Sequence, residues 1–267
     1  MTEYSKSLIG SKTIVGMIHI KALPGAPNNT LSPKEIINQA LEEARIFASE
    51  GVDNIGIENM HDLPYLNRHV GPEITSLMAI IGHEIKSKVD VKCGVQILAG
   101  ANIQAMSAAY SAGLDFIRAE GFVFSHIADE GMMNSDAGDL LRYRKQIGAE
   151  NICVFTDIKK KHSSHQITND VSVVETAKAA QFFLSDGLIV SGHSTGSEVN
   201  LDEVKAVAEI AETPVIIGSG ITPENIEKYY RFADAFIVGS YFKEDGIWFN
   251  KLSAERINKM TKLVSHL

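Results

Sequence analysis

Near the C-terminal end of this 267-residue chain, two apolar runs finish in glycine and serine: Pro214-Val215-Ile216-Ile217-Gly218-Ser219-Gly220-Ile221-Thr222-Pro223 and Ala235-Phe236-Ile237-Val238-Gly239-Ser240. Consecutive strands of a (β/α)8 barrel present backbone N–H groups to a phosphate in this way. Glycine lets the backbone approach an anion closely because it carries no Cβ. The two segments therefore predict a barrel with a phosphate site at the C-terminal ends of its strands.

Outside these segments, short apolar runs alternate with longer amphipathic stretches. Continuous apolar runs are typical of parallel strands that are covered on both faces. The expected strands are residues 13–18, 54–57, 91–97, 116–119, 152–156, 187–190, 215–217 and 235–238. The expected helices are residues 33–50, 72–88, 103–112, 136–147, 171–184, 201–210, 223–232 and 253–266. The pattern predicts a single (β/α)8 TIM barrel domain over residues 1–267, and a doubly wound sheet is the alternative.

Long insertions follow the expected strands, whereas the connections from helix to strand are short. The insertions are residues 21–31, 59–71, 121–135, 159–170 and 241–252. Long loops on one face of a barrel mark that face as functional. On the opposite face, four aspartates precede strands at matching positions and are predicted to be structural turn residues: Asp53, Asp115, Asp186 and Asp234.

The composition narrows the possible partners and compartments. The net charge of −8 and the lack of a basic stripe argue against nucleic acid. Cys93 and Cys153 lie inside apolar runs, which favours reduced, buried thiols over a Cys-rich zinc or iron–sulfur site. No signal-peptide pattern opens the chain, and no apolar run approaches the roughly 20 residues that span a bilayer. We expect a cytoplasmic protein without an integral membrane segment.

Four candidate catalytic residues follow the expected strands: His19, Glu58, Asp157 and Lys159. At the end of an apolar strand, the Glu58 carboxylate would be partly desolvated, so its pKa would rise. It is either a general base or metal ligand, or a structural carboxylate paired with Arg118 or Lys159. Spaced two apart, Asp157 and Lys159 would share one strand face and either work as an acid–lysine pair or stiffen the rim. His19 is either an acid/base group or a satisfied hydrogen-bonding residue.

The other polar residues at the strand ends are candidate substrate-binding residues. They are Asn59, Gln96, Arg118, Glu120, Ser191, Gly192, Gly218, Ser219, Gly220, Gly239 and Ser240. The loop at 191–196, which includes His193 and Thr195, is expected to contact the ligand. The basic run at 159–165 either closes over a phosphate or is a solvated loop.

No cofactor is predicted, because no metal-ligand spacing and no dinucleotide-binding glycine pattern after the first strand is present. Two alternatives involve a cofactor. One is a divalent ion bound by His19, Glu58, Glu120 and Asp157, and the other is a flavin whose phosphate occupies the glycine loops.

Trp248 and Phe249 form an apolar pair in the last loop. This pair predicts either a homo-oligomer or, equally, a cover for the barrel mouth.

Several stretches together resemble the BtpA/SgcQ family. They are Gly16-Met17-Ile18-His19, Leu23-Pro24-Gly25-Ala26-Pro27, Glu58-Asn59-Met60-His61-Asp62, Val70-Gly71-Pro72-Glu73, Leu140-Leu141-Arg142-Tyr143-Arg144, Asp157-Ile158-Lys159-Lys160-Lys161-His162 and Gly218-Ser219-Gly220-Ile221-Thr222-Pro223-Glu224-Asn225. The resemblance covers nearly the whole chain and implies a barrel. It also implies a link of one cyanobacterial branch to photosystem I accumulation, as a peripheral membrane protein, and of another branch to sugar metabolism.

The sequence predicts an enzyme acting on a small phosphorylated metabolite, either a sugar phosphate or a nucleotide-derived compound. Isomerase, lyase and hydrolase chemistry all fit the candidate residues. The alternatives are an assembly or stability factor that binds protein partners, and a flavin- or metal-dependent barrel enzyme.

Overall fold

Eight parallel strands close into a barrel in the order β1-β11-β10-β9-β7-β4-β3-β2. The computed structural model describes residues 8–10, 12–192, 194 and 196–267. The barrel strands are β1 (Thr13–His19), β2 (Asn54–Glu58), β3 (Lys92–Gln96), β4 (Phe116–Ala119), β7 (Cys153–Ile158), β9 (Gly187–Val190), β10 (Val215–Ile217) and β11 (Ala235–Val238). The closed order confirms the predicted (β/α)8 TIM barrel, and the doubly wound alternative is wrong.

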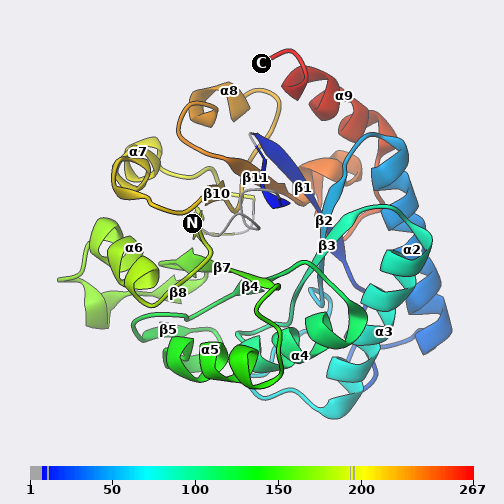
Figure 1. Ribbon diagram of the computed structural model, residues 1–267. Coiled ribbons are helices and arrows are strands. Elements are labelled where there is room, and N and C mark those ends of the chain that lie inside the picture. The colour runs from blue at the N-terminus through cyan, green and yellow to red at the C-terminus, as the bar shows by residue number, and fades with distance from the viewer. Residues whose placement is uncertain (1–7, 11, 193, 195) are drawn as a thin grey trace.

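The helices form a ring around the barrel (Figure 1). They are α2 (Pro33–Ser49), α3 (Pro72–Lys88), α4 (Asn102–Ala112), α5 (Ala137–Gln146), α6 (Val173–Phe182), α7 (Leu201–Ile210), α8 (Ile226–Tyr229) and α9 (Ala254–Val264), with the 3-10 turns η1 (Gln166–Thr168), η2 (Ser240–Phe242) and η3 (Glu244–Gly246). A capping box of Ser32 and Glu35 starts α2, where it satisfies backbone N–H groups of the first turn.

Helix α8 is much shorter than the sequence predicts. It begins at Ile226, whereas residues 223–232 were expected to be helical. The Asn225 side chain accepts a hydrogen bond from the Thr222 N–H and donates one to the Gly220 carbonyl. These bonds close residues 220–225 into a turn, so the helix starts only after Asn225.

Alternate strand residues face two different cores. Ile57, Val95 and Ile217 lie between the barrel and the helices. Their neighbours of opposite parity point into the barrel, where an apolar cluster at the N-terminal end consists of Leu8, Ile9, Val15, Met17, Phe116, Cys153, Phe155, Ile189, Ile216, Ala235 and Ile237. Because strand side chains alternate with a period of two, the next inward positions toward the C-terminal ends include His19, Glu58 and Asp157.

Two of the long loops form a small antiparallel sheet that was not predicted from the sequence. Strands β5 (His126–Ala128), β6 (Gly131–Met133) and β8 (Ser163–Ser164) pair in the order β6-β5-β8. This sheet joins the loop after β4 to the loop after β7. It brings Glu130, in the turn between β5 and β6, to 4.0 Å from the Lys160 ammonium group.

Three of the four predicted structural aspartates tie neighbouring strands together. The carboxylates of Asp115, Asp186 and Asp234 accept hydrogen bonds from the N–H groups of Cys93, Val154 and Val215, each at 2.8 Å. In each case an aspartate at the start of one strand binds the start of the strand before it. The exposed Asp53 contributes its backbone carbonyl, which accepts from the Lys92 N–H.

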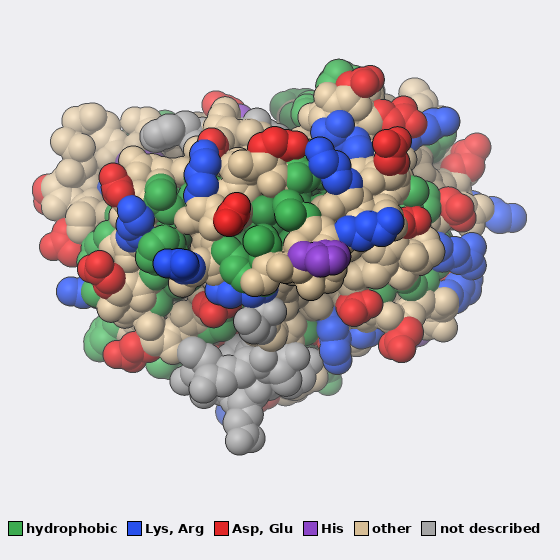
Figure 2. Space-filling model, turned by 90° about the horizontal axis from the view of Figure 1, so that it is seen from above, with side chains coloured by type: hydrophobic (Ala, Val, Ile, Leu, Met, Phe, Trp, Pro, Cys, Tyr) green, Lys and Arg blue, Asp and Glu red, His purple; other side chains and the backbone are tan. Residues whose placement is uncertain are grey.

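Among the described residues, no helix combines the length and the apolar character that crossing a membrane requires. The face of the molecule in Figure 2 carries acidic and basic side chains that are interspersed.

We predict that Asp186→Ala lowers the free energy of unfolding by about 2–3 kcal/mol, because it removes the side-chain acceptor of the Val154 N–H and the ion-pair partner of Arg144. Asp53→Ala is the matched control and should change it by less than about 0.5 kcal/mol. Urea unfolding of both variants measures the difference, and equal stabilities would contradict the role assigned to these aspartates.

Candidate functional site

Two adjoining cavities open at the C-terminal end of the barrel. The glycine cavity, of about 170 Å³, is bounded by residues 218–222 and 237–241. The carboxylate cavity, of about 220 Å³, is bounded by Gln96, Glu120, Asp129, Glu130 and Lys160. Four residues line both cavities and form their shared wall: Glu58, Met60, Arg118 and Lys161. The site is thus divided into two compartments with polar groups between them.

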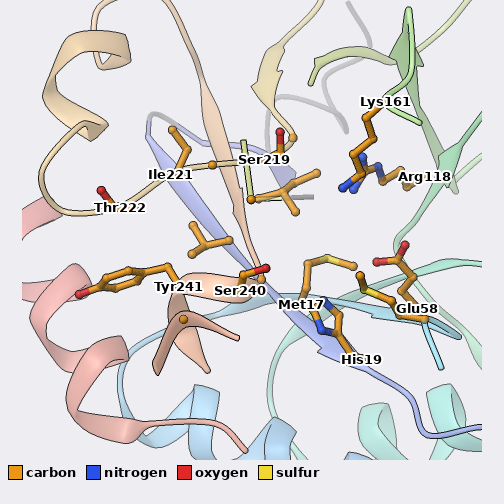
Figure 3. Close-up of a pocket in the computed structure, with 18 of the residues that line it drawn as sticks. Met17, His19, Glu58, Arg118, Lys161, Ser219, Ile221, Thr222, Ser240 and Tyr241 are labelled. Carbon is orange, nitrogen blue, oxygen red and sulfur yellow. The ribbon is translucent and has the colours of Figure 1, made fainter. Parts of the chain in front are cut away.

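Backbone donors line the glycine cavity. Within the part of the chain that the structure describes, the N–H groups of Gly220, Ser240 and Tyr241 donate no hydrogen bond. Figure 3 shows Ser240 and Tyr241 at one end of this pocket, whereas Glu58, Arg118 and Lys161 converge at the other. Unused N–H groups beside a buried serine-glycine turn are the donors that a phosphate binds.

At two of the glycine positions, neighbouring side chains leave little or no room for a Cβ atom. A Cβ on Gly218 would lie 2.6 Å from both Ile189 and Ser191, and a Cβ on Gly239 would lie 3.0 Å from His19 Nε2. Gly220 has a φ of 69°, the left-handed conformation that glycine adopts most readily. Close packing at the barrel mouth therefore accounts for Gly218 and Gly239, in addition to any approach of an anion.

Glu58 is the carboxylate of the shared wall. It ends β2, is only 9% exposed, and has no ion-pair partner within 4.0 Å among the described residues. Burial raises its pKa, and the charge of Arg118 only partly opposes that rise. The predicted pairing of Glu58 with Arg118 or Lys159 is wrong, because Arg118 is bound elsewhere. A desolvated carboxylate without a partner is suited to accept a proton.

Arg118 is fixed by Asp157 in a buried, bidentate ion pair. Its Nε and Nη2 donate to the two carboxylate oxygens at 2.7 and 2.8 Å, and Ser191 Oγ donates to one of them at 2.7 Å. Burial alone would raise the pKa of Asp157, but Arg118 and these hydrogen bonds outweigh it and lower the pKa. Asp157 is therefore a permanent anion that orients Arg118, and neither it nor Ser191 lines a cavity.

Lys161, and not Lys159, is the lysine of the shared wall. Strand β7 ends at Ile158, and Lys159 has a φ of 51°, so the strand alternation that would place Lys159 beside Asp157 is broken. Lys159 lines neither cavity. Burial and the neighbouring Arg118 lower the pKa of Lys161. The sequence signal was the basic run at 159–165, which did not indicate which lysine faces the site.

His19 is held as a neutral ring. Its Nδ1 lies 2.8 Å from the Trp248 carbonyl, which can only accept, so Nδ1 carries the proton and Nε2 is left as an acceptor. Burial lowers the pKa of His19 to about 3, and the charge of Lys243 adds to this effect. His19 lines the glycine cavity as a hydrogen-bond acceptor.

The predicted binding residues divide between the cavities and their supports. Glu120, bound to Lys160 at 3.2 Å, and Gln96 line the carboxylate cavity. Asn59 is instead a buried structural residue, which accepts a hydrogen bond from the Leu98 N–H and donates one to Asp62. The Gly192 N–H donates a hydrogen bond to Ser219 Oγ. His193 and Thr195 lie outside the described residues.

Three further residues were missed or left open by the sequence. Trp248 lines the carboxylate cavity and packs its ring 4.8 Å from that of His61, so it covers the barrel mouth, whereas Phe249 is exposed. Thr222 and Arg256 line the glycine cavity. In the described ranges, no three His, Cys, Asp or Glu residues are placed to hold a metal ion.

The comparison with protein families decides the membership of the chain. The model of the BtpA family matches residues 10–266. The chain belongs to the BtpA family. This confirms the resemblance seen in the sequence, and the shared-wall residues lie within the matched range.

Among relatives of this BtpA-family chain, an uncharacterized mitochondrial protein of Caenorhabditis elegans is 49% identical over 98% of this chain and 97% of its own length. The Photosystem I biogenesis protein BtpA of Synechocystis is 30% identical over 87% of this chain and 81% of its own.

Solved structures support the fold. The chain is similar to (S)-3-O-geranylgeranylglyceryl phosphate synthase from Thermoplasma acidophilum, solved with its substrate sn-glycerol-1-phosphate, with a TM-score of 0.62, 18% identity and 100% of both chains covered. It is also similar to thiamine phosphate pyrophosphorylase from Pyrococcus furiosus, with a TM-score of 0.60, 14% identity and 98% of both chains covered.

We predict that His19→Asn makes this BtpA-family protein less sensitive to acid. Between pH 6.5 and about 3, the unfolded chain binds a proton at His19 that the folded chain does not, so His19 lowers stability as the pH falls. The asparagine amide can still donate to the Trp248 carbonyl. From pH 6 to pH 4.5 the variant should lose about 1–2 kcal/mol less unfolding free energy than the wild type.

Urea unfolding across this pH range makes the measurement, and His83→Asn, at an exposed position of α3, is the control. Equal pH slopes for wild type and His19→Asn would show that His19 is not held neutral.

Proposed function

We propose that this chain is an enzyme that acts on a small phosphorylated metabolite, with the phosphate in the glycine cavity. The observation that carries the proposal is the shared wall, where Glu58, Arg118 and Lys161 line both cavities. A ligand whose phosphate binds at one end is thereby anchored with its remaining atoms against three ionisable groups. Remote anchoring of this kind orients the reacting atoms and lowers the barrier.

The local charges support phosphate in the glycine cavity although the whole chain carries a net charge of −8. Arg118, Lys161 and Arg256 line the cavity together with the unused backbone N–H groups. Backbone dipoles and nearby cations attract an anion locally, whatever the net charge of the chain. The similar synthase of Thermoplasma acidophilum was solved with a small phosphorylated substrate, which agrees with this assignment.

In the proposed chemistry, Glu58 accepts a proton from the substrate carbon or oxygen nearest the shared wall. Lys161, whose pKa is lowered, is the matching proton donor or acceptor. Arg118 stabilises negative charge that develops on the substrate, and Asp157 keeps the guanidinium in place. His19 offers Nε2 as an acceptor for a substrate hydroxyl. Isomerase, lyase and hydrolase reactions all use such a set.

The alternatives make different predictions. A protein-binding assembly factor, suggested by the name of the Synechocystis relative, would not need unpaired Glu58 and Lys161 beside an anion site. A flavin-dependent enzyme would absorb in the flavin bands after purification, and a metal-dependent one would need an added divalent ion. The cytoplasmic location, homo-oligomer and lack of nucleic-acid partners stay predictions. The name of the Caenorhabditis elegans relative assigns that protein to mitochondria.

We predict that Ser240→Asp weakens the binding of inorganic phosphate by about tenfold or more, because it places a like charge in the glycine cavity. Ser240 makes no side-chain hydrogen bond with a described residue, so the change should leave the fold intact. Ser76→Asp, at an exposed site on α3, is the control. Calorimetric titration with phosphate makes the measurement, and unchanged affinity in Ser240→Asp would place the anion elsewhere.

A thermal-shift screen of phosphorylated metabolites, with and without divalent ions, should identify a stabilising ligand. If the protein catalyses the conversion of a ligand found in this screen, we predict that Glu58→Gln and Lys161→Met each lower kcat by about 100-fold or more. Each variant removes a group that transfers a proton. The phosphate affinity should stay within about threefold in Glu58→Gln, whereas Lys161→Met should also weaken phosphate binding, because it removes a cation that lines the glycine cavity. Full activity in both variants would reject the mechanism even if phosphate binds as proposed.

A further inference from the structure

The carboxylate cavity is lined by Gln96 and Glu130, which each have a buried side-chain oxygen without a hydrogen-bond donor among the described residues. We propose that it binds the hydroxyl-rich carbon skeleton of a sugar, so that the substrate is a sugar phosphate with an uncharged, hydroxyl-bearing end. The inference rests on the proposed function, because the phosphate in the glycine cavity sets the direction in which the ligand lies.

Gln96 is the first unfilled group. It is 3% exposed, it lines the cavity beside Glu58 and Arg118, and its Oε1 has no hydrogen-bond partner among the described residues. A buried amide oxygen without a partner is unfavourable relative to a bonded one. A ligand hydroxyl, which both donates and accepts, would satisfy the amide in either orientation.

Glu130 is the second unfilled group, and it enters from the turn between β5 and β6. Its side chain is 9% exposed, and its Oε2 lies 4.0 Å from Lys160, too far for a hydrogen bond. Lys160 instead donates to Glu120 at 3.2 Å. The small antiparallel sheet thus holds a carboxylate acceptor over the cavity while its nearest cation is bound to another carboxylate.

The charges that line the carboxylate cavity determine which hydrogen-bond donors a ligand can place there. Four carboxylates line it, from Glu58, Glu120, Asp129 and Glu130. Of the lysine and arginine side chains that line it, Arg118 and Lys160 are each ion-paired with a carboxylate, and Lys161 lies at the shared wall, next to the phosphate end of the ligand. A carboxylate or second phosphate at this end of the ligand would be repelled and would leave the acceptors unfilled. Hydroxyl groups donate without bringing negative charge.

The remaining wall is apolar and suits a carbon skeleton. Leu63, Leu98 and Trp248 line the cavity together with the carboxylates. The C–H face of a sugar packs against such a surface while its hydroxyls reach the polar side. The two cavities have similar sizes, about 170 and 220 Å³, and meet at the shared wall. The reacting carbon of a ligand that fills both lies beside Glu58 and Lys161.

The test compares ligands that share a phosphate and differ at the other end. Calorimetric titrations would use inorganic phosphate, ribose 5-phosphate, glucose 6-phosphate, 6-phosphogluconate and adenosine monophosphate. We expect at least one of the two uncarboxylated sugar phosphates to bind about tenfold or more tightly than phosphate, and 6-phosphogluconate to lose that gain. Tightest binding by 6-phosphogluconate or by the nucleotide would overturn the proposal.

Two variants assign the gain to the cavity. Glu130→Gln, in a hairpin turn, and Gln96→Met should each reduce the advantage of the sugar phosphate to below about threefold while inorganic phosphate binds within about twofold of wild type. Glu209→Gln, on the exposed face of α7, is the control and should change neither affinity. A full sugar gain in Glu130→Gln would overturn the proposal even if Gln96→Met proved unstable.

The result also separates this inference from the proposed function. Phosphate binding that Ser240→Asp weakens, without a gain from the sugar, overturns only the present proposal. Absence of phosphate binding in the wild type overturns both.

Discussion

The buried ion pair between Arg118 and Asp157 determines what every other group at the barrel mouth can do. Its two side chains are only 6% and 1% exposed, so each charge needs the other to offset the cost of leaving water. Asp157 uses both oxygens on Arg118 and Ser191. Arg118 is therefore unavailable to Glu58, and burial together with the positive charge of Arg118 keeps the pKa of Lys161 low. One structural pair thus leaves the carboxylate and the lysine of the shared wall without a tight partner.

The barrel could be predicted because its signal is local and repeated. Each strand is an apolar run whose alternate residues enter two cores, each helix cap depends on residues close in the sequence, and the aspartates recur at matching positions before the strands. The sheet of β5, β6 and β8 could not be predicted, because its strands are two or three residues long. Its pairing of Ile127 with Ser164 joins residues far apart in the chain, and no alternation marks either segment.

The site was predictable as far as strand parity holds. His19, Glu58, Gln96 and Arg118 face inward because they continue the alternation of regular strands. Lys159 was misplaced because parity ends with the strand, and a single residue with a φ of 51° turns the chain so that Lys161 enters the site instead. Asn59 was predicted to bind substrate because a polar residue that follows a strand can do so. Such a residue can equally hold two loops together through hydrogen bonds. Only the hydrogen bonds to Leu98 and Asp62 distinguish these roles.

The two cavities differ in which part of the chain builds them, and this limits what a shared fold can reveal. The glycine cavity is made by backbone at the ends of β10 and β11, so any chain that closes the same barrel with the same turns can bind an anion there. The carboxylate cavity is made by side chains from strand ends and from the loops after β2, β3, β4, β7 and β11, including the turn that carries Glu130. At 14–18% identity, the likeness to solved barrels shows the fold alone. What this chain binds therefore depends on its own side chains, which in the carboxylate cavity include Gln96, Glu120 and Glu130.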